Sequence, residues 1–102
     1  MGELVSTYVK WPMKDVHDDL DYAALWASWL DPGDYIVESR WRVPSGMRAH
    51  DDSISADGKS TIVWISGGEN VPSQPAALVQ NSIRTAGGRV CTKTIALPLG
   101  PS

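Results

Sequence analysis

The hydrophobic pattern of the chain has the two-residue period of β-strands along most of its length. The clearest stretch is residues 53–68, SISADGKSTIVWISGG, in which two alternating runs flank the pair Asp57-Gly58. An Asp-Gly link between such runs is the strongest short-range signal for a β-hairpin, because both central residues then adopt positive φ. We therefore predict two strands here, joined by a two-residue turn.

Further strands are predicted on both sides of this hairpin. Residues 35–43 alternate, and residues 76–85 and 89–99 alternate around Gly87-Gly88, which predicts a second hairpin with a mirror-type turn. The face of residues 35–43 that we expect to be buried consists of Tyr35, Val37, Ser39, Trp41 and Val43. The opposite face carries charged residues and is expected to face solvent.

Residues 21–30, DYAALWASWL, fit two kinds of element. Leu25 and Trp29 have the i, i+4 spacing of a helix, but alternate residues of the same run also separate onto two faces of a strand. A turn cluster, Asp31-Pro32-Gly33-Asp34, ends the run. Because the segments that follow are all predicted strands, we predict a strand here as well.

Strands at roughly ten-residue spacing predict an all-β protein, and specifically an immunoglobulin-like β-sandwich of about seven strands with an extended N-terminal arm. We expect the arm to cover residues 1–20, where Pro12 interrupts regular structure, the sandwich residues 21–99, and a short tail residues 100–102. A chain of 102 residues forms one core. Four tryptophans are expected to fill the space between the sheets: Trp26, Trp29, Trp41 and Trp64.

Composition and charge exclude several classes of function. The chain is 42% hydrophobic and 21% charged, which is globular, and its net charge of −3 gives no reason to expect nucleic-acid binding. No apolar run approaches the roughly 20 residues of a membrane span, and no signal peptide is evident. The single cysteine, Cys91, has no partner for a disulfide, so synthesis in a reducing compartment is expected.

No motif indicates catalysis or a cofactor. The two glycine pairs lack the residues of a phosphate-binding loop, and His17 and His50 have no motif partners for zinc. The aspartates near His17 lack the spacing of a calcium loop. Cys91 could act as a nucleophile with a histidine and an aspartate, but nothing in its sequence context would activate it. We therefore expect a protein that is not an enzyme and holds no cofactor or metal.

Seven residues are candidates for contact with a partner protein. Trp11 lies beside Pro12 in the predicted arm, outside any expected core, and is interpreted as an anchor for a neighbour's pocket. Four arginines, Arg40, Arg42, Arg48 and Arg89, could gather on one outward face and pair with an acidic patch, including the aspartate-rich arm of the next copy. On this view residues 1–14 can be deleted without loss of folding. The candidates are Trp11, Pro12, Asp15, Asp18, Asp19, Arg40 and Arg42.

Five segments in a fixed order resemble a known family. They are DxLDYxxxWxxWL, IVESRWRVPSG, SISADGKSTIVWISGG, VQNSIRTAGGR and KTIALPL. Together they are similar to the immunoglobulin-like fiber-tail adaptor proteins of tailed bacteriophages, over about residues 15–97. The matching positions are Trp41, Val43, Pro44, Asp57, Gly58, Val63, Trp64, Ser66, Gly67, Gly68, Asn81, Ile83, Thr85, Gly88 and Arg89. Ala77, where an aromatic is expected, and the longer loop after Gly68 depart from the family pattern.

The resemblance implies a structural protein of the virion that joins the tail or neck to a fibre or to neighbouring virion proteins, with no active site. We expect several symmetric copies in each particle, no nucleic-acid or membrane partner, and synthesis in the host cytoplasm. A decoration or cement protein of the capsid is an alternative in the same class. A carbohydrate-binding module, with exposed tryptophans stacking on sugars, is an alternative in another class.

Overall fold

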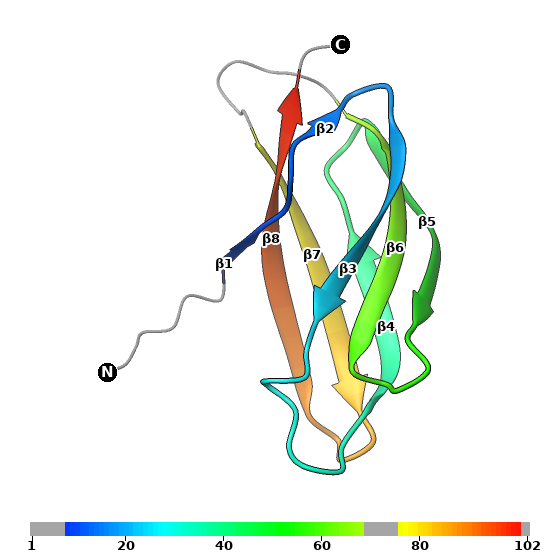
Figure 1. The fold of residues 1–102 in the computed structure, drawn as a ribbon, viewed down its shortest axis with the longest axis vertical. Coiled ribbons are helices and arrows are strands. Elements are labelled where there is room, and N and C mark those ends of the chain that lie inside the picture. Colours follow the sequence, from blue (N-terminus) through cyan, green and yellow to red (C-terminus); the bar gives the residue numbers. More distant parts are fainter. Residues whose placement is uncertain (1–7, 69–75, 101–102) are drawn as a thin grey trace.

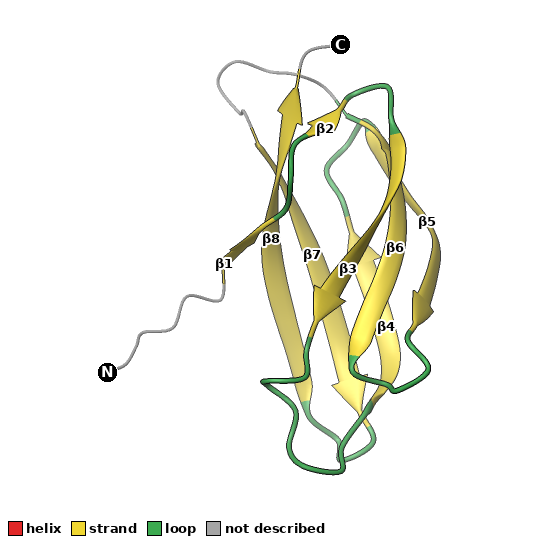
Figure 2. Cartoon of the chain, in the orientation of Figure 1, coloured by secondary structure: helices red, strands yellow, loops and turns green. Residues whose placement is uncertain are grey.

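The chain is described by a computed structural model that covers residues 8–68 and 76–100, with side chains from Trp11 onward. These residues form β-strands joined by turns and contain no helix (Figure 2). The strands are β1 (Tyr8–Lys10), β2 (Lys14–Asp15), β3 (Asp19–Leu25), β4 (Ile36–Arg42), β5 (Met47–Ile54), β6 (Ser60–Gly67), β7 (Ala76–Thr85) and β8 (Val90–Gly100). The prediction of an all-β chain is confirmed.

The strands form two sheets arranged as a sandwich (Figure 1). The larger sheet has the order β1-β8-β7-β4, with the two-residue β2 also paired to β8, and the smaller sheet has the order β3-β6-β5. β7 runs antiparallel to both β8 and β4, and β6 runs antiparallel to both β3 and β5. Within the described residues, β4 and β5 each pair with one strand only, so both are edge strands.

The core consists of alternate residues from the central strands. Val63, Val79 and Ile95 lie on β6, β7 and β8, and each is fully buried, as are neighbours two positions along. This follows from the strand period, which directs every second side chain into the space between the sheets. Full burial of one such side chain stabilises the fold by about 1.5–3 kcal/mol.

A buried polar network lies inside this apolar core and is centred on the side-chain amide of Asn81. Its Oδ1 accepts hydrogen bonds from Trp26 Nε1 at 3.0 Å and from Thr61 Oγ1 at 2.6 Å. Its Nδ2 donates to Ser39 Oγ at 3.0 Å and to the carbonyl oxygen of Arg40 at 3.1 Å. These four bonds use the full capacity of an asparagine amide and join β7 to β4 and to the smaller sheet.

Both predicted hairpins are present, but their turns differ from the predicted type. Ser55 N–H donates to the carbonyl of Ser60, so the loop between them holds four residues, of which only Gly58 has positive φ. A Cβ on Gly58 would lie 2.7 Å from the Cβ of Tyr35, so glycine is also required by close packing. At the second hairpin, Gly88 has positive φ and Gly87 does not.

The prediction for the buried face of residues 35–43 is wrong at its start. Tyr35 and Val37 are exposed, with 51% and 42% of their surface accessible, whereas Ile36 is buried. The pairing of β4 with β7 shifts between Ile36 and Glu38, so a β-bulge inserts one extra residue and reverses the faces. Beyond the bulge, Trp41 packs against the core as predicted.

The tryptophans divide differently from the prediction. Trp26 is buried, but Trp64 lies on the outer face of β6 and is 39% exposed, so its expected place between the sheets is wrong. Trp11 was expected outside any core and is buried instead. Its ring stacks on Tyr22 at 4.5 Å between centroids, and its Nε1 donates to the carbonyl of Ala23 at 3.2 Å.

Part of the predicted arm is paired with β8. β1 and β2 both run parallel to β8, and Lys14 of β2 is fully buried. Its ammonium donates to the carbonyl of Gly67 on β6 at 2.7 Å and so ties β2 to the other sheet. The division at residues 20 and 99 stays a prediction. Residues 1–7, the loop at residues 69–75 and residues 101–102 lie outside the described residues.

The ambiguous run at residues 21–30 is a strand only in its first half. β3 ends at Leu25, and Trp26 then accepts two backbone hydrogen bonds, from Trp29 N at 2.9 Å and from Leu30 N at 3.1 Å. The chain therefore leaves the strand after Leu25 and turns at residues 26–30, the second half of the run that fitted both a helix and a strand. This turn places the Trp26 indole against Asn81.

We predict that Asn81→Leu lowers the free energy of unfolding by about 2–4 kcal/mol, because the buried donors of Trp26 and Thr61 lose their acceptor. Chemical denaturation measures this change. Gln80→Leu is the matched control, since Gln80 occupies the outer side of the same strand. An Asn81 variant as stable as the Gln80 variant would contradict a structural role for the network.

We predict that Trp11→Ala lowers the free energy of unfolding by about 3–5 kcal/mol, because it removes a buried indole from the core. Trp64→Ala, at the half-exposed position, should cost about 1 kcal/mol or less. Thermal or urea unfolding of both variants gives the comparison. By the same argument, deletion of residues 1–14 should impair folding. Equal losses from the two substitutions would show that Trp11 is not part of the core in solution.

Candidate interaction surfaces

The outer face of β4, β7 and β8 carries the predicted arginines. Arg40 and Arg42 are exposed on β4, beside Gln80 and Ser82 of β7. Neither arginine makes an ion pair with any carboxylate of residues 8–68 or 76–100. A shallow hollow lined by residues of β4, β7 and β8 runs over this face and includes both arginines. Two of the four arginines expected on one face therefore lie together on the outer side of β4, and their role in partner binding stays a prediction.

A third arginine on the same face is already neutralised. Arg84 Nε donates to Glu38 Oε1 at 2.9 Å. This hydrogen bond and the attraction between the two charges lower the pKa of Glu38 and raise that of Arg84. Of the other expected arginines, Arg48 lies on β5 of the smaller sheet and Arg89 pairs with Asp31 at 3.3 Å. The four arginines therefore do not gather on one face, and Arg40 and Arg42 are the two that this face presents without an ion pair in the described residues.

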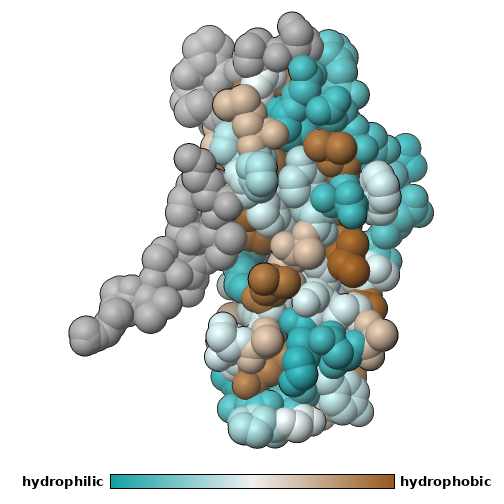
Figure 3. All heavy atoms as spheres, viewed as in Figure 1, coloured by the Kyte–Doolittle hydropathy of each residue, from teal (hydrophilic) through white to brown (hydrophobic). Residues whose placement is uncertain are grey.

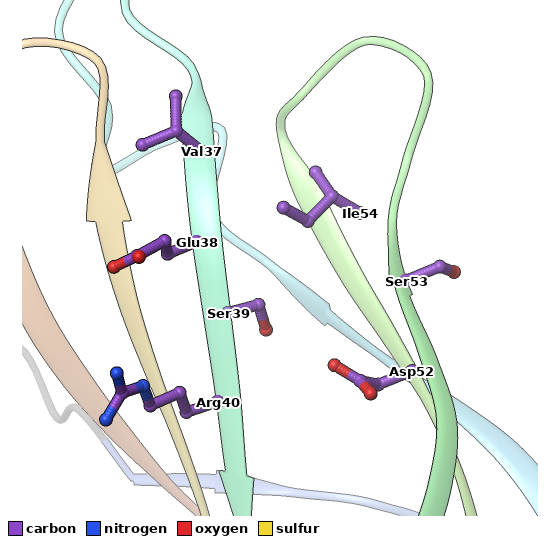
Figure 4. A pocket seen from close by; sticks show the side chains of 7 residues that line it. All are labelled: Val37, Glu38, Ser39, Arg40, Asp52, Ser53 and Ile54. Atoms are coloured by element: carbon purple, nitrogen blue, oxygen red, sulfur yellow. The ribbon is translucent and has the colours of Figure 1, made fainter.

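A groove lies beside this face, between the edge strands β4 and β5 (Figure 4). Val37, Glu38, Ser39 and Arg40 line one wall, and Asp52, Ser53 and Ile54 line the other. It continues into a second hollow of about 340 Å³ that reaches the core at Ala49 and Val63 and is also lined by Trp41. Arg40 lines the basic face and both hollows.

The predicted acidic residues lie elsewhere on the molecule. Asp15 ends β2, Asp18 lies in the following turn, and Asp19 begins β3. Asp15 Oδ1 accepts a hydrogen bond from His17 N at 2.8 Å, which shapes the turn. Within one chain these aspartates do not meet Arg40 and Arg42. Asp19 belongs to the smaller sheet, and Asp15 lies on β2, which β8 and β7 separate from β4.

The buried ammonium of Lys14 lies close to this acidic patch. Burial lowers its pKa, and the negative charges of Asp18, Asp15 and Asp19 act in the opposite direction. Part of the acidic charge therefore serves to keep the buried ammonium ionised, a structural role that the sequence analysis did not assign.

Trp11 and Pro12 differ in their access to a partner. Pro12 is exposed, whereas Trp11 is 8% exposed and occupies the chain's own core. To enter a pocket of a neighbouring protein, the Trp11 indole would first have to leave the core of its own chain. Hydrophobic residues on the visible surface form separate spots among polar ones (Figure 3). That view therefore shows no broad apolar area that could bind a partner in place of Trp11.

Sequence reasoning missed the groove, because the order of strands decides which edges are free and periodicity does not encode that order.

Sequence reasoning also missed the contacts of His50, which lies on the outer face of β5 opposite Trp64. His50 Nε2 lies 2.9 Å from Asp19 Oδ1, and its Nδ1 lies 3.0 Å from Asp51 Oδ2. Hydrogen bonds to Asp19 and then Asp51 raise the pKa of His50 above its usual value.

The described residues offer little for other chemistry. No group of three or more His, Cys, Asp or Glu side chains within residues 8–68 and 76–100 is placed to hold a metal ion. The same part of the chain has no helix that is long and apolar enough to cross a membrane. Cys91, the candidate nucleophile, is half-buried and packs against the core, and its thiol lies 3.9 Å from the carbonyl oxygen of Thr92. The described surface presents charged residues, free strand edges and grooves.

The raised pKa of His50 predicts a pH-dependent contribution to stability. The charged imidazolium is favoured in the folded state, so its contribution is present below the unfolded pKa of about 6.5 and is lost as pH rises through the folded pKa. The stability difference between the wild type and His50→Gln should therefore shrink with rising pH. NMR titration should also show a lower His50 pKa in Asp19→Asn. An unchanged pKa in that variant would contradict the assigned contact.

Comparison with known proteins identifies the family. The model of a family described as podophage GP4 fiber-tail adaptor protein gp77 matches residues 14–98. The match begins at the buried Lys14, ends within β8, and takes in strands of both sheets. A search of curated proteins finds no match. Proteins of this family are structural adaptors of the phage particle that contact other virion proteins. The chain belongs to the podophage GP4 fiber-tail adaptor family, as its resemblance predicted.

Proposed function

We propose that this protein joins the phage tail or neck to a fibre protein, as a rigid block present in several symmetric copies. The observation that carries the proposal is the pair of exposed arginines on β4, Arg40 and Arg42, which have no ion-pair partner in the described part of the chain. The family match supports the adaptor role. The proposal also places synthesis of the protein in the host cytoplasm, before its incorporation into the virion.

Two surfaces suit the two sides of such a junction. The basic face of β4 fits an acidic patch on one partner, and the exposed aspartates Asp18 and Asp19 with Pro12 fit a second partner or a second copy. Because Pro12, Asp18 and Asp19 lie around β2 and the start of β3, away from the outer face of β4, a copy can engage two neighbours at once. Repetition of one such contact around a symmetry axis closes a ring and multiplies weak contacts.

The placement of the indoles weakens the carbohydrate-binding alternative. The sugar platform would be built from the four tryptophans Trp26, Trp29, Trp41 and Trp64. Trp26 is buried and hydrogen-bonded to Asn81, Trp41 packs against the core, and the guanidinium of Arg89 covers Trp29 at 4.0 Å. Trp64 is the exposed member, and it is flanked by His50 rather than by another indole. A stacking platform needs several adjacent faces, which this arrangement does not present.

We predict that Arg40→Glu/Arg42→Glu reduces incorporation into particles about tenfold or more, because the reversed charges repel an acidic partner. The measurement complements phage that lacks the gene with each variant and quantifies the protein in purified particles and tails. Arg48→Glu, an exposed arginine on β5, is the control for loss of positive charge.

Circular dichroism and thermal unfolding establish that both variants fold. Incorporation of the double variant at the level of the Arg48 variant would overturn the role of the basic face. Recovery of the protein with capsids from which tails have been removed would favour the decoration alternative over the adaptor.

A further inference from the structure

The hydrogen bonds of the hairpin between β7 and β8 show which backbone N–H and C=O groups of β7 point toward β4. From these, the groups of β4 that point to its free side can be identified. Thr85 N–H donates to the carbonyl of Arg89 at 2.9 Å, and the carbonyl of Thr85 accepts from Gly88 N at 2.9 Å. Both backbone groups of Thr85 therefore face the β8 side. In an antiparallel sheet, successive residues direct these groups to alternate sides. Arg84 and Ser82 consequently direct theirs toward β4.

The same alternation continues on β4 itself. Arg84 pairs with Glu38, and Ser82 pairs with Arg40, so Glu38 and Arg40 direct their backbone groups to β7. The carbonyl of Arg40 also accepts from Asn81 Nδ2, which agrees with this direction. Ser39 and Trp41 then direct their N–H and C=O groups to the free edge, where no strand of the described structure pairs with them.

The open part of this edge has clear limits. At its start, Ile36 N–H donates to the carbonyl of Gly58 at 2.9 Å, so the turn between β5 and β6 already covers the edge. The bulge at Val37 follows. The regular, unpaired stretch is therefore Ser39 to Arg42, and its spacing of about 6.6 Å between alternate residues is that of a strand template.

The two edges of the smaller sheet, β3 and β5, are less suited to strand addition. On β3, the carbonyl of Ala23 accepts from Trp11 Nε1, and Lys93 Nζ donates to the carbonyl of Leu25, so both groups are occupied. β5 carries a bulge in which Asp51 has φ of +50°, a conformation that interrupts pairing. Of these three edges, β4 is the one in which two regularly spaced residues have open backbone groups.

The side chains of β4 define which strand would fit. On the solvent face, a residue added opposite Arg40 would form a non-hydrogen-bonded pair, in which side chains approach most closely. Arg40 and Arg42 carry uncompensated charge there, so carboxylates at alternate positions of the added strand would pair with both. Asp52 lines the opposite wall of the groove, which disfavours acidic residues on the inward face.

The inward face of the groove favours small polar or β-branched residues. Ser39 and Ser53 line its middle, and Val37 and Ile54 line one end. Trp41 lines the deeper hollow, and its Nε1 is buried without a hydrogen-bond acceptor within residues 8–68 and 76–100. A threonine or serine hydroxyl on the added strand would satisfy this donor.

We propose that the free edge of β4 binds an extended strand of a partner virion protein by strand addition, and that this strand alternates carboxylates on its solvent face with hydroxyl or small residues on its groove face. That the partner is a virion protein rests on the proposed adaptor function. The geometry and charge of β4 define the chemistry of the strand that it would bind. Main-chain hydrogen bonds to Ser39 and Trp41 supply binding, and Arg40 with Arg42 supplies specificity.

Amide hydrogen exchange of the full chain, measured by NMR, tests the geometry. In the free protein the amide of Arg40 should be protected by β7, and the amides of Ser39 and Trp41 should exchange faster. The probe is a short synthetic peptide that alternates threonine and glutamate, and a peptide that alternates threonine and lysine is its control. The acidic peptide should slow exchange at Ser39 and Trp41 about tenfold and should bind about tenfold more tightly than the basic one.

Charge reversal provides the decisive variant. Arg40→Glu/Arg42→Glu should reverse the preference and bind the threonine–lysine peptide more tightly, whereas Arg48→Glu should retain the wild-type preference. Ser39→Pro, which removes an N–H from the free edge, should weaken binding of the acidic peptide. Should that variant not fold, the reversed preference alone decides the question.

The outcomes separate this inference from the adaptor function. Equal binding of the two peptides, or binding that leaves Ser39 and Trp41 exchange unchanged, overturns strand addition. If the arginine variant is nevertheless lost from particles, the adaptor function stands and its partner binds in another way. If the peptide preference reverses but the variant enters particles normally, the edge binds strands and the adaptor role of this face fails.

Discussion

The side-chain amide of Asn81 forms four hydrogen bonds inside the core, and the positions of several strands depend on them. Two reach the smaller sheet through Trp26 and Thr61, and two reach β4 through Ser39 and Arg40. An unmet donor or acceptor on a buried amide costs about 1–3 kcal/mol, so any arrangement that breaks one of the four bonds is destabilised by about that amount. Apolar packing alone would tolerate small slips of one sheet over the other.

This constraint bears directly on the proposed interaction surface. Ser39 and Arg40, which bind the Asn81 amide, also belong to the open stretch of β4. The edge that we propose for strand addition is thereby fixed from inside the core. Such an edge would keep its shape without a partner, and a preorganised site loses less conformational entropy on binding.

Charge explains why an open edge need not cause aggregation. Free edges are templates for unwanted pairing, and natural sheets protect them with bulges and charged residues. β4 has both, since a bulge lies at Val37 and two uncompensated arginines follow it. Two copies meeting at the centre of this stretch would bring like charges together, whereas an acidic strand would neutralise them. The same residues would thus exclude one pairing and select another.

The sequence predicted those features that depend on local chemistry. Alternation identified the strands, and the Asp57-Gly58 and Gly87-Gly88 pairs located both hairpins, although the detailed turns depend on how the strands pair. The exposed positions of Arg40 and Arg42 followed from the same alternation.

Features set by distant contacts were not predictable in this way. No local pattern marks the bulge that exposes Val37, because a bulge depends on the register with β7. The burial of Trp11 depends on Tyr22 and Ala23 of another strand, and Pro12 beside it gave a misleading local signal. The groove required knowledge of which strands lie at the edges.

A reconstruction of the intact particle by electron cryo-microscopy tests the central claim most directly. The account predicts that in each copy the segment Ser39 to Arg42 lies in contact with a neighbouring virion protein, with carboxylates beside Arg40 and Arg42. A particle in which this edge of β4 faces solvent in all copies, while other surfaces make the contacts, would contradict it.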